Sequence, residues 1–430
     1  MVTPYIPNTQ DDQNRIMETI GISSVDELFR DIPRGRLNPS FDLPGPMAEA
    51  DLLRELQSMA AKNWTLDVHT SFLGNGSTNR FVPSIVGHII GRNEFLTAYT
   101  PYQPEVSQGI LQAIYEYQSL VSQLFQMDAT NAGMYDGASA LAEAALMACR
   151  QTKRNRVAVR KSISPLLREV LETYLNAQEI EIVENVDDES ACLIVQQPNH
   201  LGVWESTDGL AAETHSLGAL LVCSVDPLSL GMFAAPGSYG ADIVVAEGQS
   251  LGIAPSFGGP GLGIFSCRKE YVRQMPSRIV GRTFDGNGKE GFVLTLQTRE
   301  QHIRREKATS NICTNETLLA IATAVYLAAL GPKGLRQVSE LAYHKAHYAA
   351  QRIGDLSGFS VNDGDIFFDE FVVQCPQSPE ATNQYLLDKG ILGGIDVSSS
   401  VPNGLLLCVT ELVTRDQIDE LVSCLERMEN

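Results

Sequence analysis

Short apolar runs alternate with amphipathic segments through the middle of the chain. Three of the longer segments carry apolar residues at helical spacing, and the runs between them are rich in Val, Ile and Leu. Buried strands that alternate with such helices are typical of an α/β fold whose mostly parallel sheet is covered on both faces. The predicted strands are RVAVR, IEIVE, CLIVQQP, LLVCSVD, ADIVVAE and GIFSCR, and the predicted helices are ASALAEAALMACRQ, SPLLREVLETYLNA and DGLAAETHSLGA.

The flanking segments predict two further parts of the chain. Residues 1–64 contain short helical patterns separated by proline, so we expect a helical arm that packs on another surface. Residues 65–330 form the predicted large α/β domain, in which residues 282–315 are polar and charged. Residues 331–430 contain two strand and helix repeats, which predict a small α+β domain.

Charge and cysteine usage narrow the function classes. The formal net charge of -20 disfavours binding to nucleic acid or to an anionic membrane, because both would be repelled. No run reaches the roughly 18 apolar residues of a membrane helix, and the first residues lack a secretion signal, so a cytoplasmic protein is expected. The eight cysteines form no CxxC pair and the scattered histidines match no metal-ligand spacing, so we expect reduced structural thiols and no metal site.

Two features at the ends of predicted elements suggest parts of a pyridoxal phosphate site. Gly137 and Ser139 follow Asp136 at the start of a predicted helix, where free backbone amides favour a phosphate. Ordinary helix capping is the alternative for these residues. Asp226 ends LLVCSVD, and in pyridoxal phosphate enzymes an aspartate at such a strand end keeps the pyridinium nitrogen protonated. An Asp-Pro turn is the alternative there.

The loop after ADIVVAE lacks the residue that this chemistry requires. A strand, a short loop and a glycine-rich return strand form the setting in which such enzymes place the lysine that binds the cofactor covalently. No lysine lies between Lys161 and Lys269, and Gln249 stands in the loop. We therefore expect no covalent link to the cofactor at this position.

Long segments of the chain resemble one enzyme family. The chain is similar to the glycine cleavage system P-protein, glycine dehydrogenase (decarboxylating), and within it to subunit 1, the alpha subunit of the two-subunit form. In the partner subunit of that family the loop reads His-Lys-Thr, and its lysine falls on Gln249 of this chain. One departure is Asn79-Arg80-Phe81, where the family usually has Asp-His-Tyr. The resemblance rests on FLGNGSTNRFVPSIV, TAYTPYQPE, MYDGASALAEAALMA, VVAEGQSLGIAPSFGGPGLGIF and QTREQHIRREKATSNICTN.

This resemblance implies a fold, a reaction and partners. The fold would be that of the pyridoxal-phosphate-dependent transferases of fold type I, the aminotransferase-like fold. The family decarboxylates glycine and transfers the aminomethyl group to the lipoyl arm of the H-protein, so it is an oxidoreductase with a disulfide acceptor. The cofactor, pyridoxal phosphate, would be carried by subunit 2, the lysine-bearing beta subunit. The two subunits would assemble as α2β2.

Two surface segments are candidates for the contribution of this chain. Tyr99 and Tyr102 lie in a proline-stiffened loop and would reach the partner's active site; packing at the interface is the alternative. Arg282, Arg299 and Arg305 belong to a locally basic stretch that would hold an anionic substrate group or an acidic carrier. Ion pairs with neighbouring glutamates are equally consistent with that stretch.

Two rival functions remain open from the sequence. A self-sufficient lyase would place its cofactor lysine elsewhere, at Lys269 or Lys307. A regulatory relative would have lost catalysis and would bind glycine or a cofactor reversibly.

Overall fold

The computed structural model describes residues 8–312, 314–361 and 364–428. The chain divides into two compact units, one ending at Trp64 and the other beginning at Thr65. The first unit consists of short helices without a sheet among its described residues, and Thr9 begins it with a capping box on α1. Its elements are α1 (Gln10–Ile20), η1 (Val25–Phe29), η2 (Arg34–Arg36) and α2 (Glu49–Ala60).

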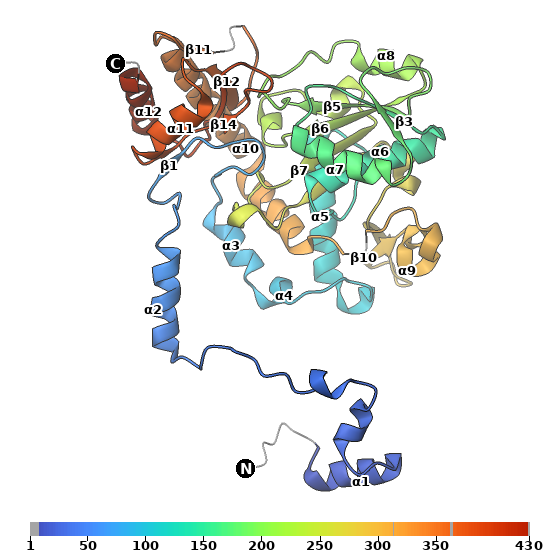
Figure 1. Cartoon of the computed structure of the whole chain (residues 1–430). Coiled ribbons are helices and arrows are strands. Elements are labelled where there is room, and N and C mark those ends of the chain that lie inside the picture. Colours follow the sequence, from blue (N-terminus) through green and yellow to red (C-terminus); the bar gives the residue numbers. More distant parts are fainter. Residues whose placement is uncertain (1–7, 313, 362–363, 429–430) are drawn as a thin grey trace. The chain divides into compact units, whose positions relative to one another are not determined.

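The second unit contains all fifteen strands of the described chain and ten of its α-helices (Figure 1). The helices are α3 (Ser84–Ile90), α4 (Asn93–Leu96), α5 (Gln108–Phe125), α6 (Gly137–Thr152), α7 (Pro165–Asn176), α8 (Leu210–Ser216), α9 (Gln301–Arg304), α10 (Thr317–Gly354), α11 (Pro379–Leu387) and α12 (Arg415–Met428). The strands are β1 (Thr70–Ser71), β2 (Ala129–Thr130), β3 (Arg156–Val159), β4 (Glu181–Val183), β5 (Cys192–Gln197), β6 (Leu220–Val225), β7 (Ile243–Glu247), β8 (Gly263–Cys267), β9 (Ile279–Phe284), β10 (Glu290–Thr295), β11 (Ser360–Val361), β12 (Glu370–Gln374), β13 (Ile391–Leu392), β14 (Ile395–Asp396) and β15 (Gly404–Cys408).

A seven-stranded sheet forms the centre of this unit, in the order β2-β8-β7-β6-β5-β3-β4. The strands from β7 to β4 in that order pair in parallel, whereas β8 pairs antiparallel with both β7 and β2. The mostly parallel sheet predicted from the sequence is therefore present. Because parallel strands end at the same edge, β5, β6 and β7 bring their carboxyl ends together.

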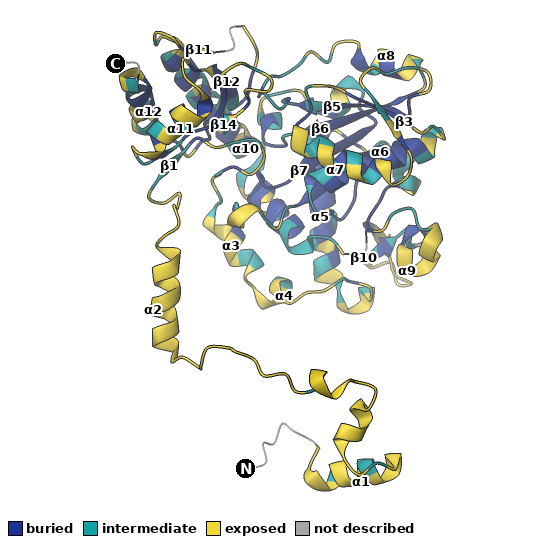
Figure 2. Ribbon diagram, in the orientation of Figure 1, coloured by how far each residue is buried: buried dark blue, intermediate teal, exposed yellow. Residues whose placement is uncertain are grey.

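The alternation of side chains along the strands divides the core into two layers. One set of strand residues, including Ile194 and Val245, packs against α6 and α7. The alternate set, including Val195 and Val244, packs against α5 and the first half of α10. Both faces of each central strand are thus apolar, which explains their nearly continuous hydrophobic sequences. Figure 2 shows these strands buried between their covering helices.

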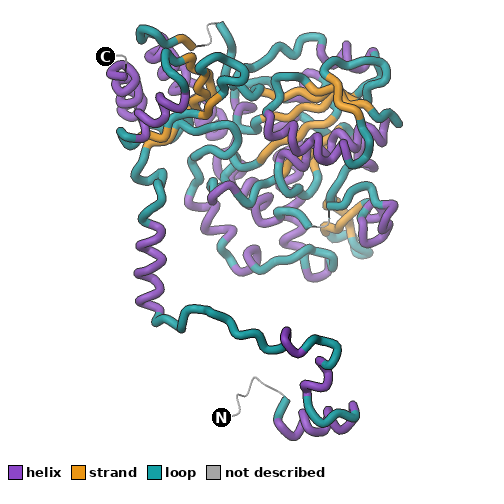
Figure 3. Tube along the Cα trace, in the orientation of Figure 1, coloured by secondary structure: helices purple, strands orange, loops and turns teal. Residues whose placement is uncertain are grey.

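A second, four-stranded sheet follows in the order β11-β12-β15-β14, and all its pairings are antiparallel. The second half of α10 and α12 cover one face, where Phe371 and Leu407 are fully buried. Figure 3 shows this sheet as a cluster of strands separate from the central sheet. The predicted strand and helix repeats at the end of the chain are therefore present. The predicted boundaries 1–64, 65–330 and 331–430 stay predictions.

Helix α10 joins the two sheets. Its φ of 60° and ψ of −177° at Gly331 break the helix directly before Pro332, where the sequence predicts a stop. Among the described residues, only α10 is long and apolar enough to cross a membrane by length and composition. Its first half packs into the core of the central sheet and its second half into that of the small sheet, as expected of a core helix.

One element escapes the sequence-based prediction. Strands β9 and β10 form an antiparallel hairpin that begins just before residues 282–315, the segment predicted only as polar and charged, and extends into it. Val280, Phe292 and Leu294 on the hairpin form a small core with Leu111 and Ile114 of α5.

The cysteines are free and buried in the described chain, as predicted, and Cys313 lies outside the described residues.

Candidate functional site

A cavity of about 290 Å³ opens at the carboxyl ends of β5, β6 and β7. The starts of α6 and α7, the segment around residues 75–80 and the beginning of β12 also contribute to its wall. Its position is the one where open α/β sheets bind ligands. The acidic side chains on its lining are Asp136, Asp226, Glu247, Asp369 and Glu370.

The amino end of α6, the predicted phosphate cup, is occupied by side chains of the protein itself. Gly137 N donates to Glu247 Oε2 at 2.9 Å, and Ser139 N donates to Asp136 Oδ1 at 2.7 Å. Asp136 and Ser139 thereby form a capping box, which is the alternative that the sequence left open. Gly137 lines the cavity, whereas Ser139 is not among the lining residues.

Glu247, at the end of β7, is the central group of this arrangement. Its Oε1 accepts hydrogen bonds from Leu262 N at 2.9 Å and from Gln249 N at 3.1 Å. Burial raises the pKa of the Glu247 carboxyl group, and the three backbone N–H donors oppose that rise because each favours the charged form.

Gln249 is buried and all its polar side-chain atoms are bonded. Its Oε1 accepts from Thr78 N at 2.9 Å, and its Nε2 donates to Thr78 O at 2.9 Å and to Ile253 O at 2.7 Å. The amide therefore ties the segment before α3 to the loop after β7. It does not point into the cavity as a free group.

Asp226 remains at the cavity wall, half-buried. Its Oδ1 accepts from Leu228 N at 3.0 Å and from Ser250 Oγ at 3.1 Å. The first bond closes the turn that was the alternative interpretation of the Asp-Pro pair.

Arg80, which stands where the family usually has a histidine, is buried in an ionic cluster. Its guanidinium pairs with Asp369, with Glu411 at 3.2 Å, and with Thr78 Oγ1 at 2.9 Å. Asp369 directly precedes β12 and Glu411 follows β15, so Arg80 fastens the segment around residue 80 to the part of the fold that holds the small sheet. The cavity's buried cation is consequently already neutralised.

Glu370 directly follows Asp369 and forms no ion pair with a cation of the described residues, although the charge of Arg80 acts on it. Burial, and next the Asp369 carboxylate, raise the pKa of Glu370 to about 7. A backbone N–H of Asn75, 2.5 Å from Oε1, works in the opposite direction.

The geometry does not fit covalently bound pyridoxal phosphate. The cofactor's phosphate would need the donors that Glu247 and Asp136 already use, and the lysine position carries an amide. Neither Lys269 nor Lys307 is among the residues that line the cavity.

The two predicted active-site tyrosines lie away from this cavity, on the loop before η3 (Pro104–Val106). Tyr99 is 81% exposed and Tyr102 is 44% exposed. Tyr102 also contacts the ring of His302 edge-on, with 5.5 Å between ring centroids.

Arg278, directly before β9, fixes the position of Tyr102. Its Nη2 donates to the Tyr102 hydroxyl at 2.9 Å, and its Nη1 donates to Asn315 Oδ1 at 3.1 Å. Arg278 is only 4% exposed and also pairs with Glu300 at 3.4 Å. The phenol oxygen is thus held by a buried guanidinium while part of the side chain faces solvent. Sequence reasoning missed the role of Arg278 because its bond to Tyr102 joins residues 176 positions apart.

The three predicted docking arginines occupy different environments. Arg282 is exposed on β9 and pairs with Glu290 at 3.4 Å, and Arg305 is exposed after α9. Arg299 is buried, and its guanidinium donates to the backbone carbonyls of Met275, Ser277 and Leu296. A surface docking role for Arg299 is therefore not supported by its position.

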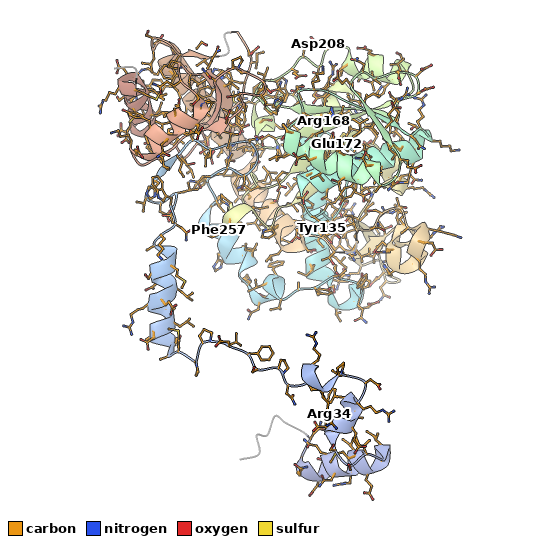
Figure 4. The ribbon with its side chains drawn as sticks, viewed as in Figure 1. Arg34, Tyr135, Arg168, Glu172, Asp208 and Phe257 are labelled. Atoms are coloured by element: carbon orange, nitrogen blue, oxygen red, sulfur yellow. The ribbon has the colours of Figure 1, made fainter. Side chains whose placement is uncertain are left out.

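Phe257 is a further exposed group near the glycine-rich loop. It projects from η6 (Ser256–Gly258) with a left-handed backbone, φ 58°, and its side chain is fully exposed (Figure 4). A left-handed backbone and full exposure are both uncommon for a bulky apolar residue.

Comparisons with known proteins agree on one family. The model of the family described as "Glycine cleavage system P-protein" matches residues 3–425. A protein of Thermomicrobium roseum named "Probable glycine dehydrogenase (decarboxylating) subunit 1" is 50% identical, covering 98% of each chain. A protein of the same name from Desulfitobacterium hafniense is 48% identical, covering 97% of this chain and 98% of its own.

One solved structure supports the same family, and a more distant one supports the fold. A crystal structure of glycine decarboxylase (P-protein) of the glycine cleavage system, in inhibitor-bound form, matches with a TM-score of 0.91 and 42% identity. It covers 99% of this chain and 100% of its own. A glutamate decarboxylase from Lactobacillus brevis, 12% identical with a TM-score of 0.67, covers 90% of this chain and 94% of its own, and shows the fold alone. The predicted fold, that of the pyridoxal-phosphate-dependent enzymes of fold type I, is confirmed. The chain belongs to the glycine cleavage system P-protein family.

Proposed function

We propose that this chain is the subunit of a glycine decarboxylase that carries no covalent cofactor. Its relatives are named subunit 1, which supports a second subunit as partner. The partner would be the lysine-bearing subunit 2, which would bind pyridoxal phosphate. The reaction would remove the carboxylate of glycine and pass the aminomethyl group to the lipoyl arm of the H-protein.

This proposal rests on the residue at the lysine position of the family, which is Gln249 in this chain. Gln249 is locked by three hydrogen bonds to backbone groups and cannot form a covalent link to a carbonyl. A member of this family without that link needs another chain to supply it. The family match over nearly the whole length supports retained function in the complex rather than an unrelated role.

The chain would complete the partner's active site with the loop that carries Tyr99 and Tyr102. The cofactor on the partner would supply the electron sink for loss of carboxylate. Tyr102 would orient the substrate through its hydroxyl, which Arg278 already holds at 2.9 Å. Exposure of 81% leaves Tyr99 free to be covered by another chain and to exclude water there.

The first unit would contribute to the contact with subunit 2. None of the residues of α1 or α2 is buried, although both carry apolar side chains at helical spacing. On α2 these are Leu52, Leu53, Leu56 and Met59, which are 44% to 52% exposed. An apolar helix face of this kind needs a covering surface. We propose the α2β2 assembly in the cytoplasm, with Arg282 and Arg305 available to an acidic carrier.

A bicarbonate-exchange assay on the co-expressed subunits tests the loop. Tyr102→Phe removes only the hydroxyl, so we expect exchange to fall roughly 100-fold or more while the complex still assembles. Tyr385→Phe, on α11, is the matched control and should leave exchange unchanged. If Tyr102→Phe and Tyr99→Phe both retain full exchange, the proposed role of the loop is wrong.

The rival self-sufficient lyase is tested separately with the purified chain. Incubation with pyridoxal phosphate, borohydride reduction and intact-mass measurement should give no adduct. A stoichiometric adduct on Lys269 or Lys307 would replace the two-subunit proposal by the rival.

A further inference from the structure

We propose that Glu247 is a built-in replacement for the cofactor phosphate, and that it closes the cavity of this chain to phosphorylated ligands. The inference goes beyond the missing lysine, because it concerns a second group. It also holds whether or not the partner subunit carries the cofactor.

The coordination of Glu247 is that of a bound anion. Its two carboxylate oxygens accept three backbone N–H groups from three separate segments: Gly137 at 2.9 Å, Leu262 at 2.9 Å and Gln249 at 3.1 Å. Gly137 is the first residue of α6, a helix of sixteen residues. Convergent N–H donors that include the amino end of a helix are the usual setting for a phosphate. Here the protein supplies the anion itself.

The glycines around Glu247 show how closely it approaches the amino end of α6. A Cβ built on Gly137 would lie 2.8 Å from the backbone nitrogen of Glu247 and 2.9 Å from its Cβ. A Cβ built on Gly261 would lie 2.9 Å from Glu247 Oε2. The close approach of the Glu247 backbone therefore requires a glycine at position 137, whereas at Gly261 the contact is only with the end of the Glu247 side chain. The glycine that suggested a phosphate cup is explained by the glutamate.

The negative charge of the cavity wall also disfavours the binding of a phosphate group. Besides Glu247, the lining carries the carboxyl groups of Asp136, Asp226, Asp369 and Glu370. Its arginine, Arg80, already pairs with Asp369 and Glu411. An entering phosphate would meet carboxylates without a free arginine to compensate them.

On this proposal, the chain lacks two requirements for cofactor binding, namely the lysine and a free phosphate position. Restoring it by Gln249→Lys should not restore cofactor binding, because the phosphate position stays filled. Removing the carboxylate as well, by Glu247→Ser, should open the amino end of α6. Serine keeps a hydrogen-bond donor and leaves space for a phosphate.

The test uses the full chain co-expressed with the lysine-bearing subunit. The complex is incubated with pyridoxal phosphate and reduced with borohydride, and the intact mass of each chain is measured. Mass separates the chains, so the adduct on the partner reports on the proposed function and the adduct on this chain reports on Glu247. We expect an adduct on the partner alone for the native complex and for Gln249→Lys. For Gln249→Lys combined with Glu247→Ser we expect an adduct on this chain. Its occupancy should be about tenfold higher, or more, than the occupancy on this chain in Gln249→Lys alone.

A second readout uses inorganic phosphate and no cofactor. Phosphate should raise the melting temperature of Glu247→Ser by roughly 2–5 °C, and should leave the native chain and the surface control Glu213→Ser unshifted. This measurement remains informative if the double variant fails to assemble. Stoichiometric adduct on Gln249→Lys alone, or a folded Glu247→Ser that ignores phosphate, would overturn the assignment.

Discussion

At the residue scale, the amide of Gln249 performs a structural task. Its carbonyl and amino groups pair with both backbone groups of Thr78 and with the carbonyl of Ile253. A lysine could neither accept from Thr78 N nor keep this planar arrangement. The replacement that removes the cofactor link thus also fastens the segment before α3 to the loop after β7.

We expect Gln249→Leu to destabilise the chain by about 2–5 kcal/mol, because it leaves buried backbone N–H and C=O groups without partners. Urea unfolding followed by circular dichroism measures this difference. The control Gln112→Leu changes an exposed glutamine on α5 and should cost less than about 0.5 kcal/mol. Equal effects of the two substitutions would mean that the bonds of Gln249 contribute nothing specific.

The raised pKa of the Glu370 carboxyl group implies that the stability of the folded chain depends on pH. Its pKa is raised from 4.5 to about 7 by burial first and then by Asp369, with Asp226 adding to the rise and Arg80 opposing it. The folded chain therefore binds more protons than the unfolded chain within this interval. The stabilisation is complete below the unfolded pKa and is lost as the pH rises through about 7. The loss should be roughly 1–3 kcal/mol.

Unfolding by urea at several pH values checks this expectation. Glu370→Gln mimics the protonated form and should flatten the decline, whereas Glu380→Gln, at the exposed start of α11, should preserve it. An unchanged pH slope in Glu370→Gln would assign the decline to other groups.

The sequence was informative about single residues only where a motif could be compared. Gln249 stands out because a family loop predicts lysine there. Glu247 gave no such signal, because its three donors come from α6, the loop after β7 and the return strand. Contacts between distant segments are set by tertiary structure and not by local pattern. Arg278 and its bond to Tyr102, 176 positions apart, escaped for the same reason.

At the scale of elements, the central strands were predictable because both their faces are buried and their sequences are almost wholly apolar. The hairpin of β9 and β10 was not, because only one side of it packs on α5 and its outer half is exposed. Yet Arg278, which holds the Tyr102 hydroxyl, directly precedes this hairpin. The missed element therefore bears directly on the proposed site.

A double-mutant cycle tests whether Arg278 acts through Tyr102. We expect Arg278→Met to lower bicarbonate exchange of the complex roughly tenfold or more, since the phenol loses its fixed orientation. In a Tyr102→Phe background the same change should cost much less, because the two residues act as one unit. Additive losses would show that Arg278 supports the fold by another route. Arg278→Lys should recover part of the exchange by keeping one donor.

The break in α10, the helix that links the two sheets, predicts how a substitution of Gly331 affects stability. Gly331 adopts φ 60° and ψ −177°, a region that residues with a Cβ rarely occupy. Gly331→Ala should therefore destabilise the chain by about 1–3 kcal/mol. Gly109→Ala, near the start of α5 where a Cβ would meet no atom within 4 Å, is the control and should be neutral or slightly stabilising. Thermal unfolding distinguishes the two.

At the scale of the whole molecule, the unit from Thr65 holds the buried cores. The first residue of any of its apolar clusters is Phe72, and the described residues up to Trp64 contribute to none of them. The sequence predicted a helical arm in the first unit from its proline-separated helices. What covers the arm could not be predicted, because an apolar stripe on a helix states only that some surface is needed.

Deletion of residues 1–64 separates folding from assembly. The truncated chain should keep its thermal unfolding transition, because the clusters of the second unit remain complete. Its binding to the lysine-bearing subunit should weaken by about tenfold or more, since the exposed side chains of α2 would no longer be buried at the contact. Size-exclusion chromatography and titration of the purified subunits measure both quantities. A milder variant, Leu52→Glu with Leu56→Glu, should reproduce the loss, whereas Gln57→Glu on the same helix should not. If the truncated chain binds its partner as tightly as the full chain, the first unit is not part of that interface and its apolar faces serve another surface.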